Sequence, residues 1–507
     1  MTLSIDQLRR DAKALRKAYK AGDAKALARV AAIFRDPSNL KHADALHVVA
    51  REAGYDSWPK LKFAVETRAL NRSAKLERLK MALFHGQGWR VSQLLSETPD
   101  LARDNLGIMC ALYDIDGARA ALARDPNAIS TPVLGPRTPI LHLAFSRWWQ
   151  HGGTEADMLA VADLLLKAGA DVNASYEQMP GYPLSALYGA IGHAMSLPLA
   201  RWFLENGADP NDGESLYHAC DLGAPALRLL FQFGATCART NALPRALDFN
   251  DLERVEVLLK GGADPNEGIH WPEESGEAPF VIPALHQAAR RLCSGEIVAR
   301  LMDAGGNPDA VEWGHTAYAL ARMYGNVEAA DLMADRGCNT TLTPEEEAIA
   351  LAVAGQPAPR IDPDRLPTET RDMIRSQVHL PEGLRRTKAL VAIGLPFDRP
   401  DPQGLTPVQI AGWEGLPDVM SYLLSLGPDL GHVNGYGGDL MSTILHGSEN
   451  AAPQPGRDHI GCLRLALEQG VPLRQSDIDF AGDPRIADFL ADWAEAHPAQ
   501  VTEKTLG

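Results

Sequence analysis

Histidine and aspartate side chains that lie close in sequence are the first candidates for acid–base or metal chemistry in this chain. His446, Asp458 and His459 surround a stretch rich in glycine and proline at 447–456. Imidazole and carboxylate groups bind zinc, and these three side chains could meet in space. They supply no fourth ligand and no fixed spacing. An enzyme with a site at 430–460 is therefore only a further hypothesis, and we expect no metal ion and no cofactor.

The sequence motifs of the commonest catalytic sites are absent. A phosphate-binding loop needs the pattern Gly-x-x-x-x-Gly-Lys-Ser/Thr, and the sequence contains no Gly-Lys pair. It contains neither the Gly-x-Ser-x-Gly pattern of many hydrolases nor the His-Glu-x-x-His pattern of metalloproteases. We therefore expect a protein that is not an enzyme and has no small-molecule substrate.

Basic side chains are concentrated at the N-terminus. Residues 1–80 contain 18 Lys and Arg against 9 Asp and Glu, whereas the whole chain has a net charge of −16. The first expected helix carries Arg9, Arg10, Lys13, Arg16, Lys17 and Lys20. Such a helix is either a solvated cap or a surface for nucleic-acid phosphates, although the acidic remainder would repel a long polyanion. A nucleic-acid-associated regulator that uses residues 1–80 is therefore the alternative hypothesis.

Length and composition indicate a large folded protein. The 507 residues exceed one compact domain, and 45% apolar with 22% charged residues exclude a mainly disordered, collagen-like or disulfide-rich chain. The six cysteines form no Cys-x-x-Cys pair, so we expect reduced core thiols. The N-terminus lacks a secretory pattern, and no apolar run is long enough to span a membrane. We therefore expect a cytoplasmic protein without membrane contact.

The elements that must position any site are helices. In the N-terminal segment the spacing of Ser4 and Gln7 predicts a capped helix that ends at Gly22, and Ser57 with Pro59 predicts the start of a fourth helix. From about residue 75 the sequence becomes self-similar. A leucine-rich helix pattern followed by Gly-Ala-Asp-x-Asn occurs at 164–173, 203–211 and 258–266.

In each copy a glycine can end the helix in the left-handed conformation, and the Asp and Asn that follow favour a tight turn. These glycines are Gly169, Gly207 and Gly262. A second pattern opens the next helix, with a threonine that can cap it, a proline at its first position and a histidine that can bond to a neighbouring turn. The residues of this pattern are Thr138, Pro139, His142, Pro283, His286, Thr406 and Pro407.

Together the two patterns resemble the ankyrin-repeat family, whose unit of about 33 residues is a turn followed by two antiparallel helices. The resemblance covers roughly 75–340 and 381–495. It implies an all-α solenoid of about nine to eleven repeats preceded by a small basic helical domain, with His142 and His286 tying adjacent turns together. Residues 43–62 are similar to a short helical module that precedes repeat domains in bacterial ankyrin proteins, which implies a bacterial source.

The expected organisation has six parts. They are a basic helical module at 1–74, degenerate ankyrin-like repeats at 75–130, ankyrin repeats at 131–342, a Pro-rich linker or irregular segment at 343–380, C-terminal ankyrin-like repeats at 381–495, and a tail at 496–507.

A solenoid offers a long concave surface, and such surfaces bind partners. We therefore expect a non-catalytic protein-interaction scaffold that binds an unidentified protein partner through its concave face and turn tips. Tryptophan and arginine are enriched where binding energy concentrates. The candidate contact residues are Arg147, Trp148, Trp149, Trp271, Glu273, Glu274 and Tyr436.

Overall fold

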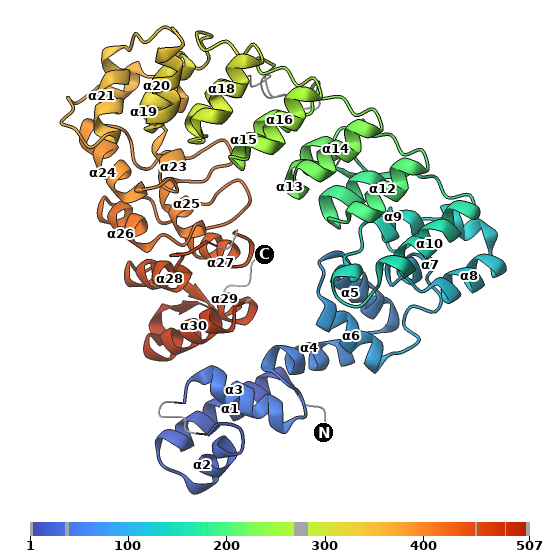
Figure 1. Cartoon of the computed structure of the whole chain (residues 1–507). Helices are drawn as coiled ribbons and strands as arrows, with labels where there is room; N and C mark the ends of the chain where they lie inside the picture. The colour runs from blue at the N-terminus through green and yellow to red at the C-terminus, as the bar shows by residue number, and fades with distance from the viewer. Residues whose placement is uncertain are drawn as a thin grey trace.

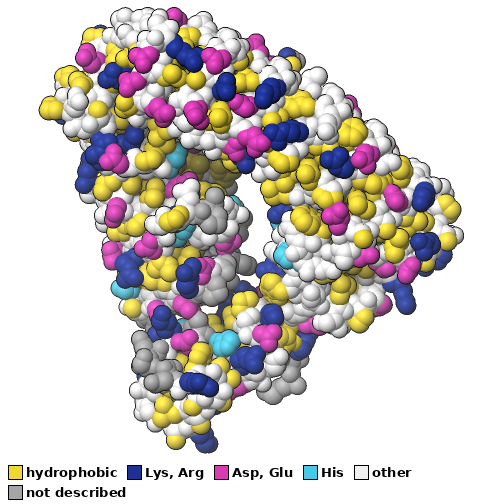
Figure 2. Space-filling view, viewed as in Figure 1, with side chains coloured by type: hydrophobic (Ala, Val, Ile, Leu, Met, Phe, Trp, Pro, Cys, Tyr) yellow, Lys and Arg dark blue, Asp and Glu magenta, His cyan; other side chains and the backbone are white. Residues whose placement is uncertain are grey.

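The computed structural model describes residues 4–35, 40–179, 181–267, 282–451, 454–481 and 483–502. The protein is mostly helical, with 60% helix and 3% strand, as the all-α prediction requires. Helices stack side by side along a strongly curved path, so that the two arms of the molecule face each other across an open space (Figures 1 and 2).

The basic N-terminal module is a group of four helices with its own core. The helices are α1 (Ile5–Lys20), α2 (Ala24–Ala31), α3 (His42–Glu52) and α4 (Trp58–Arg68). The Ser4 hydroxyl accepts a hydrogen bond from the Gln7 backbone N–H, which confirms the predicted first cap. Leu8, Leu15 and Val30 are buried in this core, separately from the main core of the molecule. The apolar stripes of α1, α2 and α3 therefore pack within the module, whereas Phe63 of α4 packs in the cluster of the next helices.

Most of the chain consists of helix pairs. The helices up to the top of the curve are α5 (Arg72–Phe84), α6 (Gly88–Glu97), α7 (Leu106–Ala111), α8 (Ile115–Arg124), α9 (Pro139–Ala144), α10 (Glu155–Lys167), α11 (Ala186–Tyr188), α12 (Leu197–Glu205), α13 (Ser215–Leu222), α14 (Ala224–Gln232), α15 (Ala242–Asp248), α16 (Leu252–Lys260), α17 (Ala284–Arg290), α18 (Gly295–Asp303), α19 (Ala317–Tyr324) and α20 (Val327–Asp335). The first helices of successive pairs contact one another, as α13, α15, α17 and α19 do, and so do the second helices.

The second arm continues the stack. Its helices are α21 (Pro344–Val353), α22 (Thr368–Arg371), α23 (Ile374–Gln377), α24 (Gly383–Ile393), α25 (Pro407–Trp413), α26 (Pro417–Ser425), α27 (Leu440–Asn450), α28 (His459–Glu468), α29 (Gln475–Phe480) and α30 (Pro484–Ala496). In Figure 1, α23, α25 and α27 lie on the inner side of the curve, whereas α24 and α26 lie on its outer side. The inner helices therefore form the wall that faces the open space.

The strands are short and lie outside the helix pairs, in the segments before or after helices. An antiparallel hairpin of β1 (Ser175–Met179) and β2 (Tyr182–Ser185) extends the turn after α10, and β3 (Leu473–Arg474) pairs in parallel with β4 (Val501–Thr502). The predicted tail at 496–507 is thus partly ordered, because it contains β4, which pairs with β3. Residues 503–507 lie outside the described residues.

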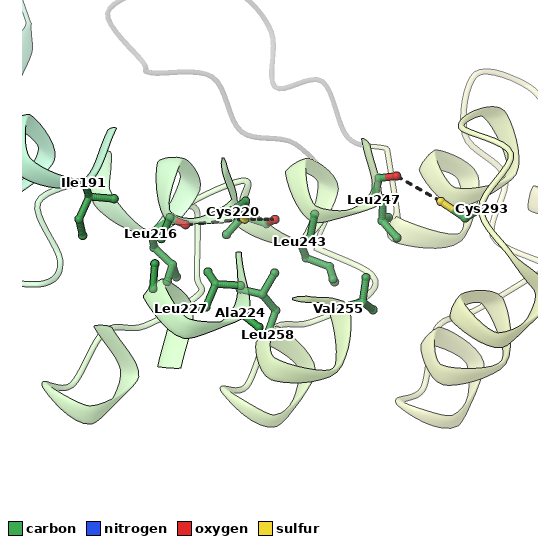
Figure 3. Close-up of a cluster of buried hydrophobic side chains, with 14 of the residues drawn as sticks. Ile191, Leu216, Cys220, Ala224, Leu227, Leu243, Leu247, Val255, Leu258 and Cys293 are labelled. Carbon is green, nitrogen blue, oxygen red and sulfur yellow. Dashed lines mark hydrogen bonds between the residues drawn. The ribbon is translucent and has the colours of Figure 1, made fainter. Parts of the chain in front are cut away.

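One continuous apolar core runs through the stacked pairs (Figure 3). Leu216, Leu227, Leu243 and Leu258 interdigitate between neighbouring pairs and are at most 5% exposed. Five of the six cysteines are buried, as predicted for reduced core thiols, and Cys338 is half-buried. Burial raises the pKa of Cys220 to about 12, so this thiol stays protonated and packs as an apolar group.

The turns between pairs are linked by asparagine side chains. Gly169, Gly207 and Gly262 have φ angles of 91°, 94° and 91°, the left-handed conformation that the repeated phrase predicts. The asparagine four residues later reaches the next turn: Asn173 Nδ2 donates to the Gly207 carbonyl at 3.2 Å, and its Oδ1 accepts from the Asp209 N–H at 2.8 Å. Asn211 and Asn266 repeat this pair of bonds.

The predicted helix starts differ in detail. Thr406 and Gln409 form a full capping box with Pro407 at the first position of α25, as predicted. Thr138 was predicted to cap α9 but does not, because its buried hydroxyl oxygen has no hydrogen-bond partner among the described residues. Pro139 occupies the first position of α9, whereas Pro283 precedes α17 by one residue.

The segment 343–380 differs from its prediction as an irregular linker. Its first part forms α21, which begins with a capping box of Thr343 and Glu346 and packs between α19 and α24. The remainder contains only a short 3-10 helix at Pro363–Arg365 and the short helices α22 and α23. The proline-rich composition therefore describes 356–367 but not the well-capped helix before it.

The two ends of the chain meet. Helix α30 packs against α3, and Arg16 Nη1 of α1 forms an ion pair with Asp492 Oδ1 of α30 at 2.8 Å. Since α4 joins the N-terminal module to the first arm, this contact closes the curve into a ring (Figure 1). In the described residues no helix has the length and apolarity needed to cross a membrane.

Candidate functional site

A groove of about 1150 Å³ lies along the inner wall of the second arm. Its lining comes from α17, α19, α22, α23, α25 and α27, and from the turns at 401–405 and 434–438. This volume exceeds the roughly 300–1,000 Å³ of typical small-ligand pockets. The stacking of inner helices therefore builds a large hollow on the wall that faces the open space.

Arg290 at the end of α17 is the central cation of the groove. Its Nε donates to Gln287 Oε1 at 2.7 Å, and its guanidinium carbon lies 5.3 Å from the ring centroid of Trp313. Within the described part of the chain no carboxylate forms an ion pair with it. Burial lowers the pKa of Arg290, yet an arginine remains charged at neutral pH. The groove thus holds a desolvated positive charge.

The carboxylates around the groove are already engaged. Glu369 pairs with Arg375 at 2.8 Å, and Glu414 pairs with Arg457 at 2.5 Å. Asp401 accepts a hydrogen bond from the Leu405 backbone N–H at 2.7 Å. Glu369 is near enough to interact electrostatically with Arg290, but none of these three groups forms an ion pair with it in the described residues.

The arginines of the groove affect the protonation of His379. Partial burial of the ring and repulsion from the guanidinium groups of Arg291 and Arg290 lower the pKa of His379, although the residue as a whole is exposed. This histidine is therefore neutral at physiological pH. It lines the groove as a hydrogen-bonding group without adding a charge.

Two aromatic residues stand on rigid turns beside Arg290. Trp313 adopts a left-handed φ of 54° in the tight turn that joins Glu312 to His315. Tyr436 is 76% exposed, and its turn is fixed because Asn434 Oδ1 accepts hydrogen bonds from the backbone N–H groups of Tyr436 and Gly438, both at 3.0 Å. Strained backbone of the kind at Trp313 is common at functional sites.

The floor of the groove is held by a chain of buried polar groups. Thr370 lines the groove and shares a 2.5 Å hydrogen bond with Nε2 of His315, whose Nδ1 lies 2.5 Å from Glu346 Oε1. All three residues are 4% exposed. Hydrogen bonds from His315 and Thr343 lower the pKa of Glu346 despite the opposing effect of burial. The chain joins α19, α21 and α22, so it fixes the inner wall.

The predicted contact residues fall into three groups. Tyr436 lies in the groove. Trp271, Glu273 and Glu274 lie outside the described residues.

Arg147, Trp148 and Trp149 are half-buried and contact neighbouring parts of the chain. The Nε of Arg147 donates to the His193 carbonyl at 2.8 Å, and the Nε1 of Trp149 donates to the Ala194 carbonyl at 3.0 Å. Trp148 packs against two parts of the core.

The predicted repeat histidines bond to turns in both cases. His286 Nε2 lies 3.1 Å from the His315 carbonyl in the next pair, so it ties adjacent turns together. His142 Nε2 lies 2.8 Å from the carbonyl of Val133 in the turn that precedes its own helix. Burial lowers the pKa of His142 to about 4, which keeps its ring neutral.

The histidines of the 430–460 hypothesis both contact Trp413. His446 stacks on its ring with centroids 5.1 Å apart, and His459 Nε2 lies 2.9 Å from its carbonyl. Asp458 accepts a hydrogen bond from the Gly461 N–H at the start of α28. Within the described ranges no group of three or more His, Cys, Asp or Glu side chains is arranged to hold a metal ion.

Comparison with models of known protein families finds no match, and comparison with curated proteins finds none either.

Sequence reasoning missed Arg290, Trp313 and His379. They lie on different turns and helices, and the phrase that marks the repeats does not extend to them. The one sequence signal was their type, since arginine and tryptophan favour binding surfaces.

Proposed function

We propose that this protein is a non-catalytic scaffold of the ankyrin-repeat class that binds a segment of a partner protein in the groove beneath Arg290. The single observation that carries the proposal is Arg290, which forms no ion pair among the described residues and lines the groove together with Trp313 and the exposed Tyr436. Arginine, tryptophan and tyrosine are the residue types that most often dominate binding energy at protein interfaces.

Assignment to the ankyrin-repeat class rests on local geometry as well as on sequence. The left-handed glycines, the asparagine bonds between turns and the bond from His286 to the next turn recur along one stack of helix pairs. These features support a solenoid, in which each unit contacts only its neighbours and the inner surface is free to bind.

The chemistry of the groove selects the partner segment. A carboxylate would form a charge-assisted hydrogen bond with Arg290, and apolar or aromatic neighbours would pack on Trp313 and Tyr436. We therefore expect an extended peptide with one acidic residue beside a bulky apolar residue. A cationic segment would place its charge against Arg290 and Arg291 and would be rejected.

Selection from a random peptide display library tests the proposal. The wild-type protein should enrich peptides with an acidic residue, and Arg290→Gln should weaken a selected peptide at least about tenfold, the loss expected when a charged hydrogen bond is removed. Arg228→Gln is the matched control, because Arg228 is 51% exposed on α14 and lies outside the groove.

Selected peptides that bind Arg290→Gln as tightly as the wild-type protein would overturn the assignment of the groove. So would a selection that enriches basic peptides.

A further inference from the structure

A second cavity, of about 1240 Å³, lies where the two ends of the chain meet. One wall is formed by α1, α3 and α4 together with α5 and α6, and the other by α29, α30 and the strand β4. We call it the closure cavity. It is separate from the groove of the proposed function, and the inference below goes beyond that function.

The lining of the closure cavity is strongly cationic. Eight Lys and Arg side chains line it, against the two carboxylates of Glu66 and Asp488. The rest of the chain is acidic, since the protein as a whole has a net charge of −16. The lining of this cavity therefore has the opposite charge balance to the chain as a whole.

Five of these cations lack a carboxylate partner among the described residues. Lys13, Lys17 and Lys20 follow one another at helical spacing along one stripe of α1, and Arg78 and Arg90 approach from α5 and α6. The Nε of Arg90 is buried without a hydrogen-bond acceptor. Burial and, to a smaller extent, the neighbouring charge of Arg78 lower the pKa of Arg90, whereas Glu66 opposes the shift.

The other part of the lining is apolar. Trp58 is half-buried at the start of α4, and Phe63, Leu46 and Ile478 lie around it. A ligand that suits this cavity therefore combines several negative charges with a flat or apolar body. An anion without such a body would leave the apolar wall in contact with water.

The volume of the closure cavity and the charge of the surrounding protein narrow the class of ligand. The volume is slightly above the range of ordinary small-ligand sites, which fits a molecule of nucleotide or dinucleotide size. A long nucleic-acid strand would extend from the cavity over an acidic protein and be repelled. We propose that the closure cavity binds a compact phosphate-rich ligand of the nucleotide class, with its phosphates on Lys13, Lys17, Lys20 and Arg78 and its base against Trp58.

Binding would link the two ends of the ring, because the cationic stripe and the opposite wall belong to different ends of the chain. This is binding without hydrolysis. The chain lacks the glycine-rich phosphate loop of nucleotide hydrolases.

Calorimetric titration of the full-length protein at low salt tests the proposal, with ATP, inorganic tripolyphosphate and a twelve-residue oligothymidylate as probes. ATP should bind, and tripolyphosphate should bind about tenfold more weakly because it lacks a base. The triple variant Lys13→Ala, Lys17→Ala, Lys20→Ala should lose at least about tenfold in ATP affinity.

The matched control replaces Lys25, Lys167 and Lys260, which are exposed and lie outside the closure cavity. It should bind ATP as the wild-type protein does, and thermal melting should show that both triple variants are folded.

Three results would overturn the proposal. They are no ATP binding by the wild-type protein, equal loss in the two triple variants, and tighter binding of the oligothymidylate than of ATP. The last result would assign the cavity to a nucleic-acid strand instead.

Discussion

Arg290 and His218 differ in how the protein compensates their positive charges. Arg290 has no carboxylate partner among the described residues, whereas His218 on α13 lies 3.4 Å from Glu214 and 3.5 Å from Asp221. Although burial opposes the charged form, hydrogen bonds to these two carboxylates raise the pKa of His218 to about 9. The charge of His218 is thus stabilised by neighbouring carboxylates, whereas Arg290 forms no ion pair among the described residues.

The raised pKa of His218 makes its contribution to stability depend on pH. The unfolded value is about 6.5, so protonated His218 stabilises the fold fully below pH 6.5, and this contribution is lost as the pH rises through 9. We expect His218→Gln to cost on the order of 1–3 kcal/mol at pH 6 and little at pH 10. Urea denaturation at both pH values measures the difference.

A loss of the same size at both pH values would show that His218 stabilises the fold through packing rather than through its charge.

Buried neutral histidines make the stability of the fold depend on pH in the opposite direction. Burial lowers the pKa of His193 to about 3 and that of His142 to about 4. Both values lie below the unfolded value of about 6.5, so these residues favour the folded state above that pH and lose this effect as the pH falls. The two kinds of histidine together place the stability maximum near neutral pH.

Single residues are the scale at which the sequence was least informative. Tyr436 could be proposed from its place in a glycine-rich turn, but Arg290 and Trp313 could not, because their contact joins α17 to a turn outside that helix. The bonds of Asn173 to Gly207 and Asp209 were also missed, since they span more than thirty residues.

At the scale of elements, helix starts were predicted from local chemistry, and two of them allow a matched test. Thr406 caps α25 through its hydroxyl, whereas the Thr138 hydroxyl is buried beside α9 without a partner. Thr406→Ala should destabilise the protein by about 1 kcal/mol, and Thr138→Ala should change its stability by no more than a few tenths, or increase it. Urea midpoints of the two variants provide the measurement.

Equal destabilisation by the two substitutions would contradict the assignment of Thr406 as the cap.

Helix pairs could be predicted because each ends in a turn whose glycine and asparagine leave a local signature. The same signature explains why the prediction for residues 343–380 was the least accurate. The segment 343–380 lacks it, so its proline content dominated the prediction, although Thr343 and Glu346 have the spacing of a capping box. The hairpin of β1 and β2 was missed because it extends a turn that the repeat already required.

At the scale of the whole molecule, the stack of helix pairs follows from its repeated turns, but its closure into a ring does not. Closure depends on contacts between α3 and α30 and on the ion pair of Arg16 with Asp492, which are separated by almost the whole chain. The Arg16 side chain is 13% exposed and that of Asp492 is 40% exposed, so this pair is only partly shielded from solvent.

Reversal of the charge at residue 16 tests the ring. In Arg16→Glu the new carboxylate faces Asp492, and we expect the two arms to separate, with a larger maximum dimension in small-angle X-ray scattering. Arg10→Glu changes the same charge on an exposed position of α1 and should leave the scattering unchanged. Identical scattering curves for the wild-type protein and Arg16→Glu would indicate that this ion pair does not hold the ring closed.

The central claim is that a partner protein binds in the groove of the second arm. Photo-crosslinking in the host cell tests it most directly, with benzoyl-phenylalanine at Tyr436 in the groove or, as a control, at Phe233, which is exposed after α14 and lies outside the groove. We expect a discrete crosslinked protein when the probe is at position 436 and none when it is at position 233. The product from position 436 should be lost when Arg290→Gln is added. The same products from both positions, or a product from position 436 that is unaffected by Arg290→Gln, would contradict it.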